Sequence, residues 1–146
     1  MLAGCGPGDD LCEPVGPAEV EVGVPDPITF LDFEPLTPGG EIPLSSNGQT
    51  FLAVQIALRA RNVRDTAEVT LRVSSRVTGM TSESVVTERL RCRDDARRYL
   101  IPVVVSSEDL GPDAEVQDSE VDVVLEVSDA DGNRATATSN GILRRL

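Results

Sequence analysis

Oxygen-bearing side chains at alternate positions near the C-terminus could bind a cation. Asp129, Asp131 and Asn133 are two residues apart, the spacing with which a calcium loop directs its oxygens at one ion. Such a loop also needs a bidentate acid at its twelfth position, and this chain has Asn140 in that region with no glutamate nearby. The Asp-Gly step within the run satisfies a hairpin turn without a metal. A turn is therefore the favoured interpretation, and calcium binding by these three residues is the alternative.

The absence of histidine from the chain removes the most familiar catalytic arrangements. A Ser-His-Asp triad, a Cys-His pair and a His-ligated zinc site all need an imidazole. The chain has 25 acidic residues, but none lies in a pattern that would raise its pKa or pair it with a nucleophile. We therefore expect a protein that is not an enzyme and that has no cofactor apart from the calcium alternative.

The net charge of the chain restricts the classes of partner that it can bind. The formal net charge of −12 opposes binding to nucleic acid and to anionic lipid head groups, because both require a basic surface. Four arginines interrupted by two aspartates form the only basic cluster in the sequence: Arg91, Arg93, Arg97 and Arg98, with Asp94 and Asp95. Local pairing with these aspartates is favoured over the docking of a ligand carboxylate. A protein or a glycan is the expected partner.

The first residues carry a candidate modification site. Leu2, Ala3, Gly4 and Cys5 resemble the lipobox of bacterial lipoproteins, in which the chain is cut before a cysteine that then carries diacylglycerol. The resemblance implies that Cys5 is lipidated. Only Met1 precedes the box where a signal peptide is expected, so we expect that the signal was trimmed or the gene start assigned too late. The alternative is a chance match in a Gly-rich tail.

The cysteine count agrees with lipidation. Three cysteines are an odd number for an exported protein, and a lipidated Cys5 leaves Cys12 and Cys92 to pair. A disulfide between residues 80 apart would stabilise the fold by roughly 4–5 kcal/mol in the chain-entropy model. It would fasten a Pro/Gly/acid segment, residues 1–17, to a domain at 18–146. The alternative is two free thiols in a cytosolic protein.

Apolar residues alternate with polar ones along most of the remaining chain, which is typical of strands. The clearest runs are residues 51–61 and 67–73, which we expect to form a central hairpin, and residues 121–127 and 135–137, which we expect to form a C-terminal one. Residues 28–33 are predicted as a strand, 41–44 as an edge strand because of Pro43, and 106–120 as a solvated acidic loop.

These elements predict an all-β protein. At 146 residues with 3% aromatic residues, the chain is one domain whose core must be aliphatic, and β-branched residues favour strands. About eight strands at regular spacing indicate an Ig-like two-sheet antiparallel β-sandwich. A jelly roll and a small barrel are the alternatives.

The segment from about 20 to 61 resembles a family of uncharacterised secreted lipoproteins of myxobacteria and related bacteria. The matching positions are Phe33, Pro35, Leu36, Gly39, Pro43, Leu44, Gly48 and Gln49. The resemblance implies a cell-envelope location and a β-sandwich, and it implies no activity.

Taken together, the sequence predicts a non-enzymatic cell-envelope lipoprotein at the outer membrane. Its sandwich would act as a binding or structural module, attached to the membrane only through the lipid on Cys5. The alternative function is a calcium-dependent surface adhesion or recognition module, with the ion at Asp129, Asp131 and Asn133.

Overall fold

The computed structural model describes residues 11–46 and 52–146. Strands dominate this part of the chain, with one 3₁₀-helix and one short α-helix. Their bounds are β1 Glu19–Pro25, β2 Phe33–Pro35, β3 Gly40–Ser45, β4 Ala53–Arg61, β5 Thr66–Ser75, β6 Thr81–Arg89, β7 Arg91–Cys92, β8 Arg98–Ser106, η1 Ser107–Leu110, α2 Asp113–Val116, β9 Glu120–Asp129 and β10 Arg134–Arg145. No helix in the described part is long and apolar enough to cross a membrane.

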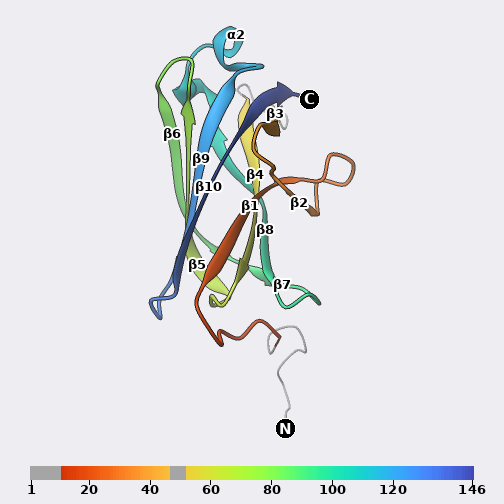
Figure 1. Ribbon diagram of the computed structural model, residues 1–146, viewed down its shortest axis with the longest axis vertical. Coiled ribbons are helices and arrows are strands. Elements are labelled where there is room, and N and C mark those ends of the chain that lie inside the picture. The colour runs from red at the N-terminus through yellow and green to blue at the C-terminus, as the bar shows by residue number, and fades with distance from the viewer. Residues whose placement is uncertain (1–10, 47–51) are drawn as a thin grey trace.

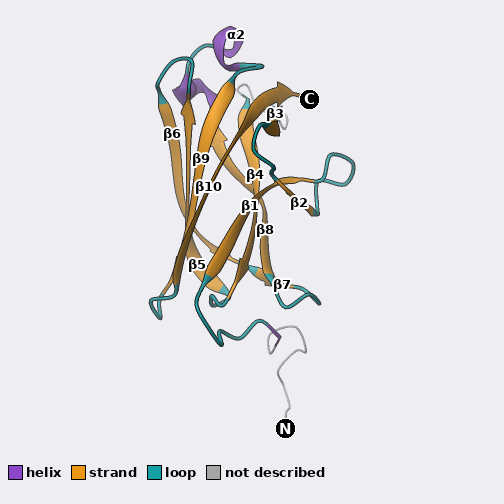
Figure 2. Ribbon diagram, in the orientation of Figure 1, coloured by secondary structure: helices purple, strands orange, loops and turns teal. Residues whose placement is uncertain are grey.

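One hydrogen-bonded sheet curls into two facing layers (Figures 1 and 2). In the first layer β4 pairs antiparallel with β1 and β8, and the short strands β2 and β7 extend it. In the second layer β5 lies between β6 and β9, and β10 pairs with β9. Strand β3 joins the layers, because it pairs parallel with β10 and antiparallel with β4. The predicted all-β sandwich is confirmed, with one parallel pair.

Alternate residues of the long strands supply an aliphatic core. Side chains that point between the layers from β4, β5 and β9 are fully buried: Val54, Ile56, Leu58, Val69, Leu71, Val73, Val121, Val123, Leu125 and Val127. Burying each such side chain contributes about 1.5–3 kcal/mol. The predicted hairpin between the last two long runs is also confirmed, since β9 and β10 pair from Arg134–Ser128 to Ile142–Glu120.

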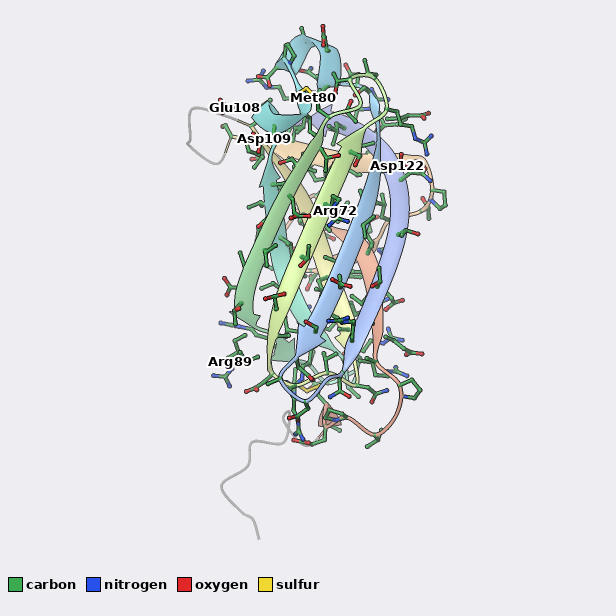
Figure 3. All side chains as sticks on the ribbon, turned by 90° about the vertical axis from the view of Figure 1, so that its left-hand side faces the viewer. Arg72, Met80, Arg89, Glu108, Asp109 and Asp122 are labelled. Atoms are coloured by element: carbon green, nitrogen blue, oxygen red, sulfur yellow. A yellow bond between two sulfur atoms is a disulfide. The ribbon has the colours of Figure 1, made fainter. Side chains whose placement is uncertain are left out.

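The outer face of the second layer is charged. Figure 3 looks onto this face, where Arg72 and Asp122 are labelled. Arg72 forms an ion pair with Glu83 at 2.6 Å, and Arg76 reaches Asp122 at 2.7 Å. These exposed pairs contribute little stability, but their charges make this face of the sandwich hydrophilic.

The expected hairpin between residues 51–61 and 67–73 is wrong. Strands β4 and β5 pair with different partners and lie in different layers. The connection between them explains the crossing: Asn62 has a φ of 63°, which turns the chain, and Val63 is fully buried. A buried residue in the connection directs the chain across the core instead of back along β4.

Three local predictions also differ. Residues 28–32 form a turn instead of a strand, because the Asp26 carboxylate accepts the backbone N–H groups of Ile28 and Thr29. Strand β3 is not at an edge, and its pairing with β4 is limited to Leu44 and Ser45, so Pro43 costs no bond there. Residues 106–120 contain η1 and α2 in place of a loop.

Candidate functional site

The candidate site is built over a glycine on β1. Gly23 pairs with both β4 and β2, and the ring of Phe33 lies directly over it. A Cβ atom at Gly23 would be 2.4 Å from Cε2 of Phe33 and 2.5 Å from the carbonyl oxygen of Glu34. Because no other residue leaves this space, Gly23 allows an aromatic side chain to lie flat on the outer face of the first layer.

Two arginines and two aromatic rings form a stack above Gly23. The guanidinium of Arg59 is 4.3 Å from the ring centroid of Phe33. The Phe33 ring meets Tyr99 edge to face, with centroids 6.2 Å apart, and Arg93 lies 4.2 Å from the Tyr99 centroid. Cation–π and edge-to-face contacts each contribute about 1 kcal/mol. The stack therefore links β2, β4 and β8 with the turn that precedes β8.

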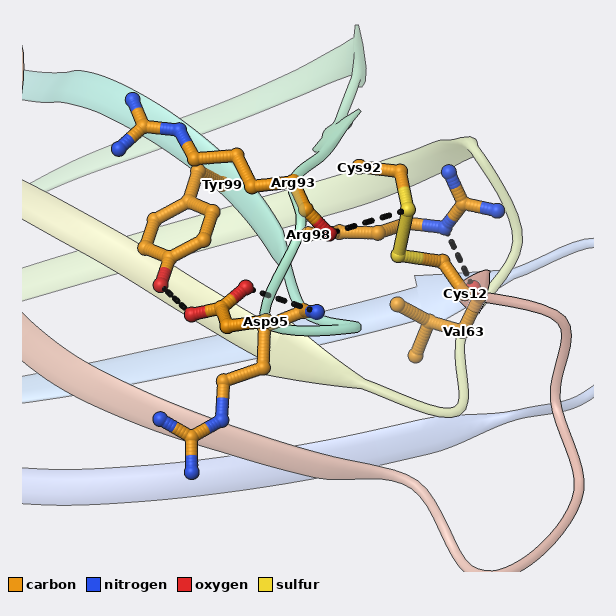
Figure 4. Close-up of a disulfide and its surroundings, with 8 residues drawn as sticks. Cys12, Val63, Cys92, Arg93, Asp95, Arg98 and Tyr99 are labelled. Carbon is orange, nitrogen blue, oxygen red and sulfur yellow. Dashed lines mark hydrogen bonds between the residues drawn. A yellow bond between two sulfur atoms is a disulfide. The ribbon is translucent and has the colours of Figure 1, made fainter. Parts of the chain in front are cut away.

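Acidic residues bind two members of the stack, Arg59 and Tyr99. Glu21 accepts from Arg59, with Nε–Oε2 at 2.5 Å and Nη2–Oε1 at 3.0 Å, and the hydrogen bond from Arg59 lowers the pKa of Glu21. The hydroxyl of Tyr99 donates to Asp95 (Figure 4). Burial raises the pKa of Tyr99, and the hydrogen bond to the Asp95 carboxylate raises it further.

Arg93 connects the stack to the loop between β1 and β2. Its Nη2 donates to the carbonyl oxygen of Leu31 at 2.9 Å, and its Nη1 is 3.3 Å from Asp32. Within the loop, the N–H of Asp26 donates to the Asp32 carbonyl and the N–H of Phe30 donates to the Asp26 carbonyl, both at 2.8 Å. The loop is thus closed on itself and bound to the sandwich.

The fixed loop presents apolar side chains to water. Ile28 is 87% exposed, Leu31 69% and Phe30 41%, and the loop projects from the body of the molecule beside β2 (Figure 1). Phe30 has a φ of 60°, a left-handed conformation that costs a non-glycine residue free energy. Exposed apolar residues grouped on one loop make it a candidate interaction surface. We call Ile28, Phe30 and Leu31 the apolar tip.

Sequence reasoning missed this site because its members come from distant strands. The one available signal was the apolar content of residues 28–33, which was interpreted as a strand. The basic cluster also pairs differently from the expectation: Arg93 bonds to the loop, and Arg98 is buried and donates to the Val63 carbonyl at 3.0 Å.

The three residues proposed for calcium form a hydrogen-bonded turn. Oδ1 of Asp129 accepts the N–H groups of Asp131 and Asn133, and Oδ2 accepts the side-chain amide of Asn133 and the N–H of Arg64. Partial burial acts to raise the pKa of Asp129, but these hydrogen bonds outweigh it and lower the pKa. The turn interpretation accounts for the three contacts within residues 129–133, the fourth ties the turn to Arg64, and calcium binding stays a prediction.

The two cysteines that the structure describes pair with each other, as the sequence predicts. Cys12 and Cys92 form a disulfide (Figure 4), and Cys12 is 4% exposed. Further contacts fix the segment next to Cys12, since Glu13 pairs with Arg64 at 2.8 Å and Asn62 bonds to the backbone of Val15 and Pro17. Cys5 lies outside the described residues.

Comparisons with known proteins add little. No family model matches the chain, and no curated protein matches its sequence. One similar solved structure is the CooA pilin subunit from enterotoxigenic Escherichia coli, with 8% identity and a TM-score of 0.37 over 87% of this chain and 98% of the pilin chain. A likeness at this level carries no argument about function.

Proposed function

We propose that this protein is a non-enzymatic module of the bacterial cell envelope that binds another protein through the apolar tip. The observation that carries the proposal is the exposure of Ile28 and Leu31 on a loop fixed by Arg93. A loop without a partner gains nothing from displaying aliphatic side chains in water. A rigid loop also loses little conformational entropy on binding.

The chemistry of the apolar tip favours a protein over other partners. Ile28 and Leu31 would fill an apolar pocket, as anchor residues do at protein interfaces. An anionic bilayer is disfavoured, because Asp26 and Asp32 flank the tip and the chain has a formal net charge of −12. A glycan is disfavoured because the most exposed side chains of the tip offer no hydrogen-bonding groups.

The location belongs to the same proposal. The Cys12–Cys92 disulfide supports an oxidising compartment outside the cytosol. The lipobox resemblance ending at Cys5 supports a lipid anchor, which we place at the outer membrane. The resemblance of the segment from about 20 to 61 to secreted myxobacterial lipoproteins supports the envelope.

We also propose that the sandwich is Ig-like. The pairing of β4 with β8 in one layer, and of β5 with β9 and β9 with β10 in the other, corresponds to strands B–E and C–F–G of that fold. Such sandwiches commonly display binding loops at their surfaces, and this topology supports a binding role without specifying the partner.

Photo-crosslinking in the bacterium that encodes the protein tests the function. Benzoylphenylalanine at position 28 should give one discrete protein adduct, and the same group at Val85, an exposed apolar residue on β6, should give none. Excess soluble domain should compete for the adduct, and the Ile28→Ser/Leu31→Ser domain should not. Because both side chains are exposed, this double variant should keep its melting temperature. Equal adducts from both positions, or adducts to lipid alone, would overturn the proposal.

Intact mass spectrometry tests the anchor separately. The gene is expressed in a bacterial host with its natural upstream sequence. A lipoprotein would begin at Cys5 and be heavier by its acyl groups. A chain with unmodified Cys5 would remove the lipid anchor from the proposal while leaving the binding loop in place.

A further inference from the structure

The lower half of β10 is an unpaired sheet edge. On one side β10 pairs with β9 over residues 134–142. On the other side its partner β3 covers only residues 141–145. In the described part of the chain, the backbone bond nearest this gap is from the Gly39 N–H to the Asn140 carbonyl at 3.2 Å. Residues 134–139 therefore pair with no described strand on that side, although β1 lies close by.

Strand geometry identifies which backbone groups face the gap. The carbonyl of Asn140 points to the side of Gly39, whereas the N–H of Leu143 donates to Ser119 on the β9 side. Because alternate residues of a strand direct their N–H and C=O groups to the same side, the even-numbered residues Arg134, Thr136 and Thr138 present theirs at the gap. This edge offers three donors and three acceptors to an added strand.

The edge lacks the features that protect other edges. Apart from Arg134 at its start, this edge contains no charge and no proline as far as residue 140, and charges, prolines and bulges are the usual means of blocking a free edge. The free edge of β6, at the opposite end of the same layer, carries Glu83, Glu88 and Arg89. The two edges of one layer thus differ, and only that of β10 is open to pairing by this criterion.

A groove of about 530 Å³ lies beside this edge, between β10 and β1. Small apolar side chains line it from three strands and the segment before β1: Ala18, Val20, Ala60 and Ala135. Charged side chains line it as well: Glu19, Glu21, Arg59, Arg61 and Arg97. Arg59 pairs with Glu21, whereas Arg61, Arg97 and Arg134, the residue before Ala135, form no ion pair within 4.0 Å among the described residues. These three arginines give the groove an excess of positive charge in a chain with a net charge of −12.

We propose that the β10 edge takes up an extended, acidic segment of another protein as an added strand. Backbone pairing with Arg134, Thr136 and Thr138 would supply affinity, and the arginines would select acidic side chains. This surface is distinct from the apolar tip, so either proposal can fail without the other.

A designed peptide tests the pairing. The fluorescein-labelled peptide DVTVEVTD supplies the alternation and the charge, and KVTVKVTK is its basic counterpart. The acidic peptide should bind and should slow hydrogen exchange at the amides of Thr136 and Thr138, measured by NMR. The basic peptide should bind at least tenfold more weakly, and salt should weaken the acidic peptide's binding.

Matched proline variants locate the site. Thr136→Pro removes an N–H group that faces the gap, and should weaken binding by about tenfold, the equivalent of one ladder hydrogen bond. Thr87→Pro makes the same change on the free edge of β6, where residue 87 also faces away from β5, and should leave binding unchanged. Melting curves verify that both variants fold. If Thr136→Pro does not fold, Arg97→Glu replaces it, with the same expected weakening.

Several results would overturn the proposal. These are no binding of DVTVEVTD at millimolar concentration, equal effects of the two proline variants, protection at β6 in place of β10, and no effect of Arg97→Glu. A dimer in sedimentation experiments without peptide, abolished by Thr136→Pro, would show that a second copy occupies the edge instead.

Discussion

The fold raises the pKa of Tyr99, and this shift can be measured directly. It is the only tyrosine of the chain, so an ultraviolet absorbance titration reports this one group. Burial and the hydrogen bond to Asp95 raise its pKa above the ordinary value of about 10. In the Asp95→Asn variant we expect a lower pKa that still exceeds the ordinary value, because the burial remains. An unchanged pKa in this variant would contradict the assigned role of the Asp95 carboxylate.

The same shift predicts how stability depends on pH. The unfolded chain ionises Tyr99 near pH 10, whereas the folded chain keeps the proton to higher pH. The contribution of Tyr99 is therefore fully present below about pH 10 and is lost as the pH rises through the raised pKa of the folded state. Denaturant titrations on the alkaline side should show a smaller loss for Asp95→Asn than for the parent, since its Tyr99 pKa is closer to the unfolded value.

At the scale of the elements, the contact between β1 and β2 depends on Gly23. We expect Gly23→Ala to destabilise the protein by about 1–3 kcal/mol, as overpacking does, because its Cβ would meet both the Phe33 ring and the Glu34 backbone. Displacing Phe33 should also change the fluorescence of Tyr99, its neighbour. Gly16→Ala is the matched control, since its nearest contact is the side chain of Asn62 at 3.5 Å. Equal melting temperatures for both variants would show that the placement of Phe33 does not require a glycine at position 23.

The elements also show what a sequence can and cannot predict. Period-two alternation located β4, β5 and β9, because one face of each strand is buried. Pairing was not predictable, since the buried Val63 that moves the chain between layers appears in the sequence as one more apolar residue. The candidate site was missed for a related reason: Gly23, Phe33, Arg59, Arg93 and Tyr99 are brought together only by pairing in three dimensions. The Asp26 turn was missed because apolar residues 28–33 suggested burial, whereas the structure exposes most of them.

At the scale of the whole molecule, the disulfide fastens the N-terminal segment to the sandwich. Cys12 and Cys92 are separated by 80 residues, and closing a loop of that length contributes roughly 4–5 kcal/mol in the chain-entropy model. The Cys12→Ser/Cys92→Ser variant should lose stability of that order in denaturant titrations. Reductant should destabilise the parent by a similar amount and should leave the variant unchanged.

This variant also separates two roles of the disulfide. The sandwich should remain folded, because its core lies between β4, β5 and β9 and does not include Cys12. The segment from Cys12 to Pro17 should be released, since its polar contacts with the sandwich are weak: the exposed Glu13–Arg64 pair, worth at most about 1 kcal/mol, and the hydrogen bonds with Asn62. Hydrogen exchange should therefore become faster at Val15, whose amide donates to Asn62, while the amides of β9 stay protected. If Val15 stays protected in the variant, Asn62 alone fixes the segment, and the disulfide acts mainly on the unfolded chain.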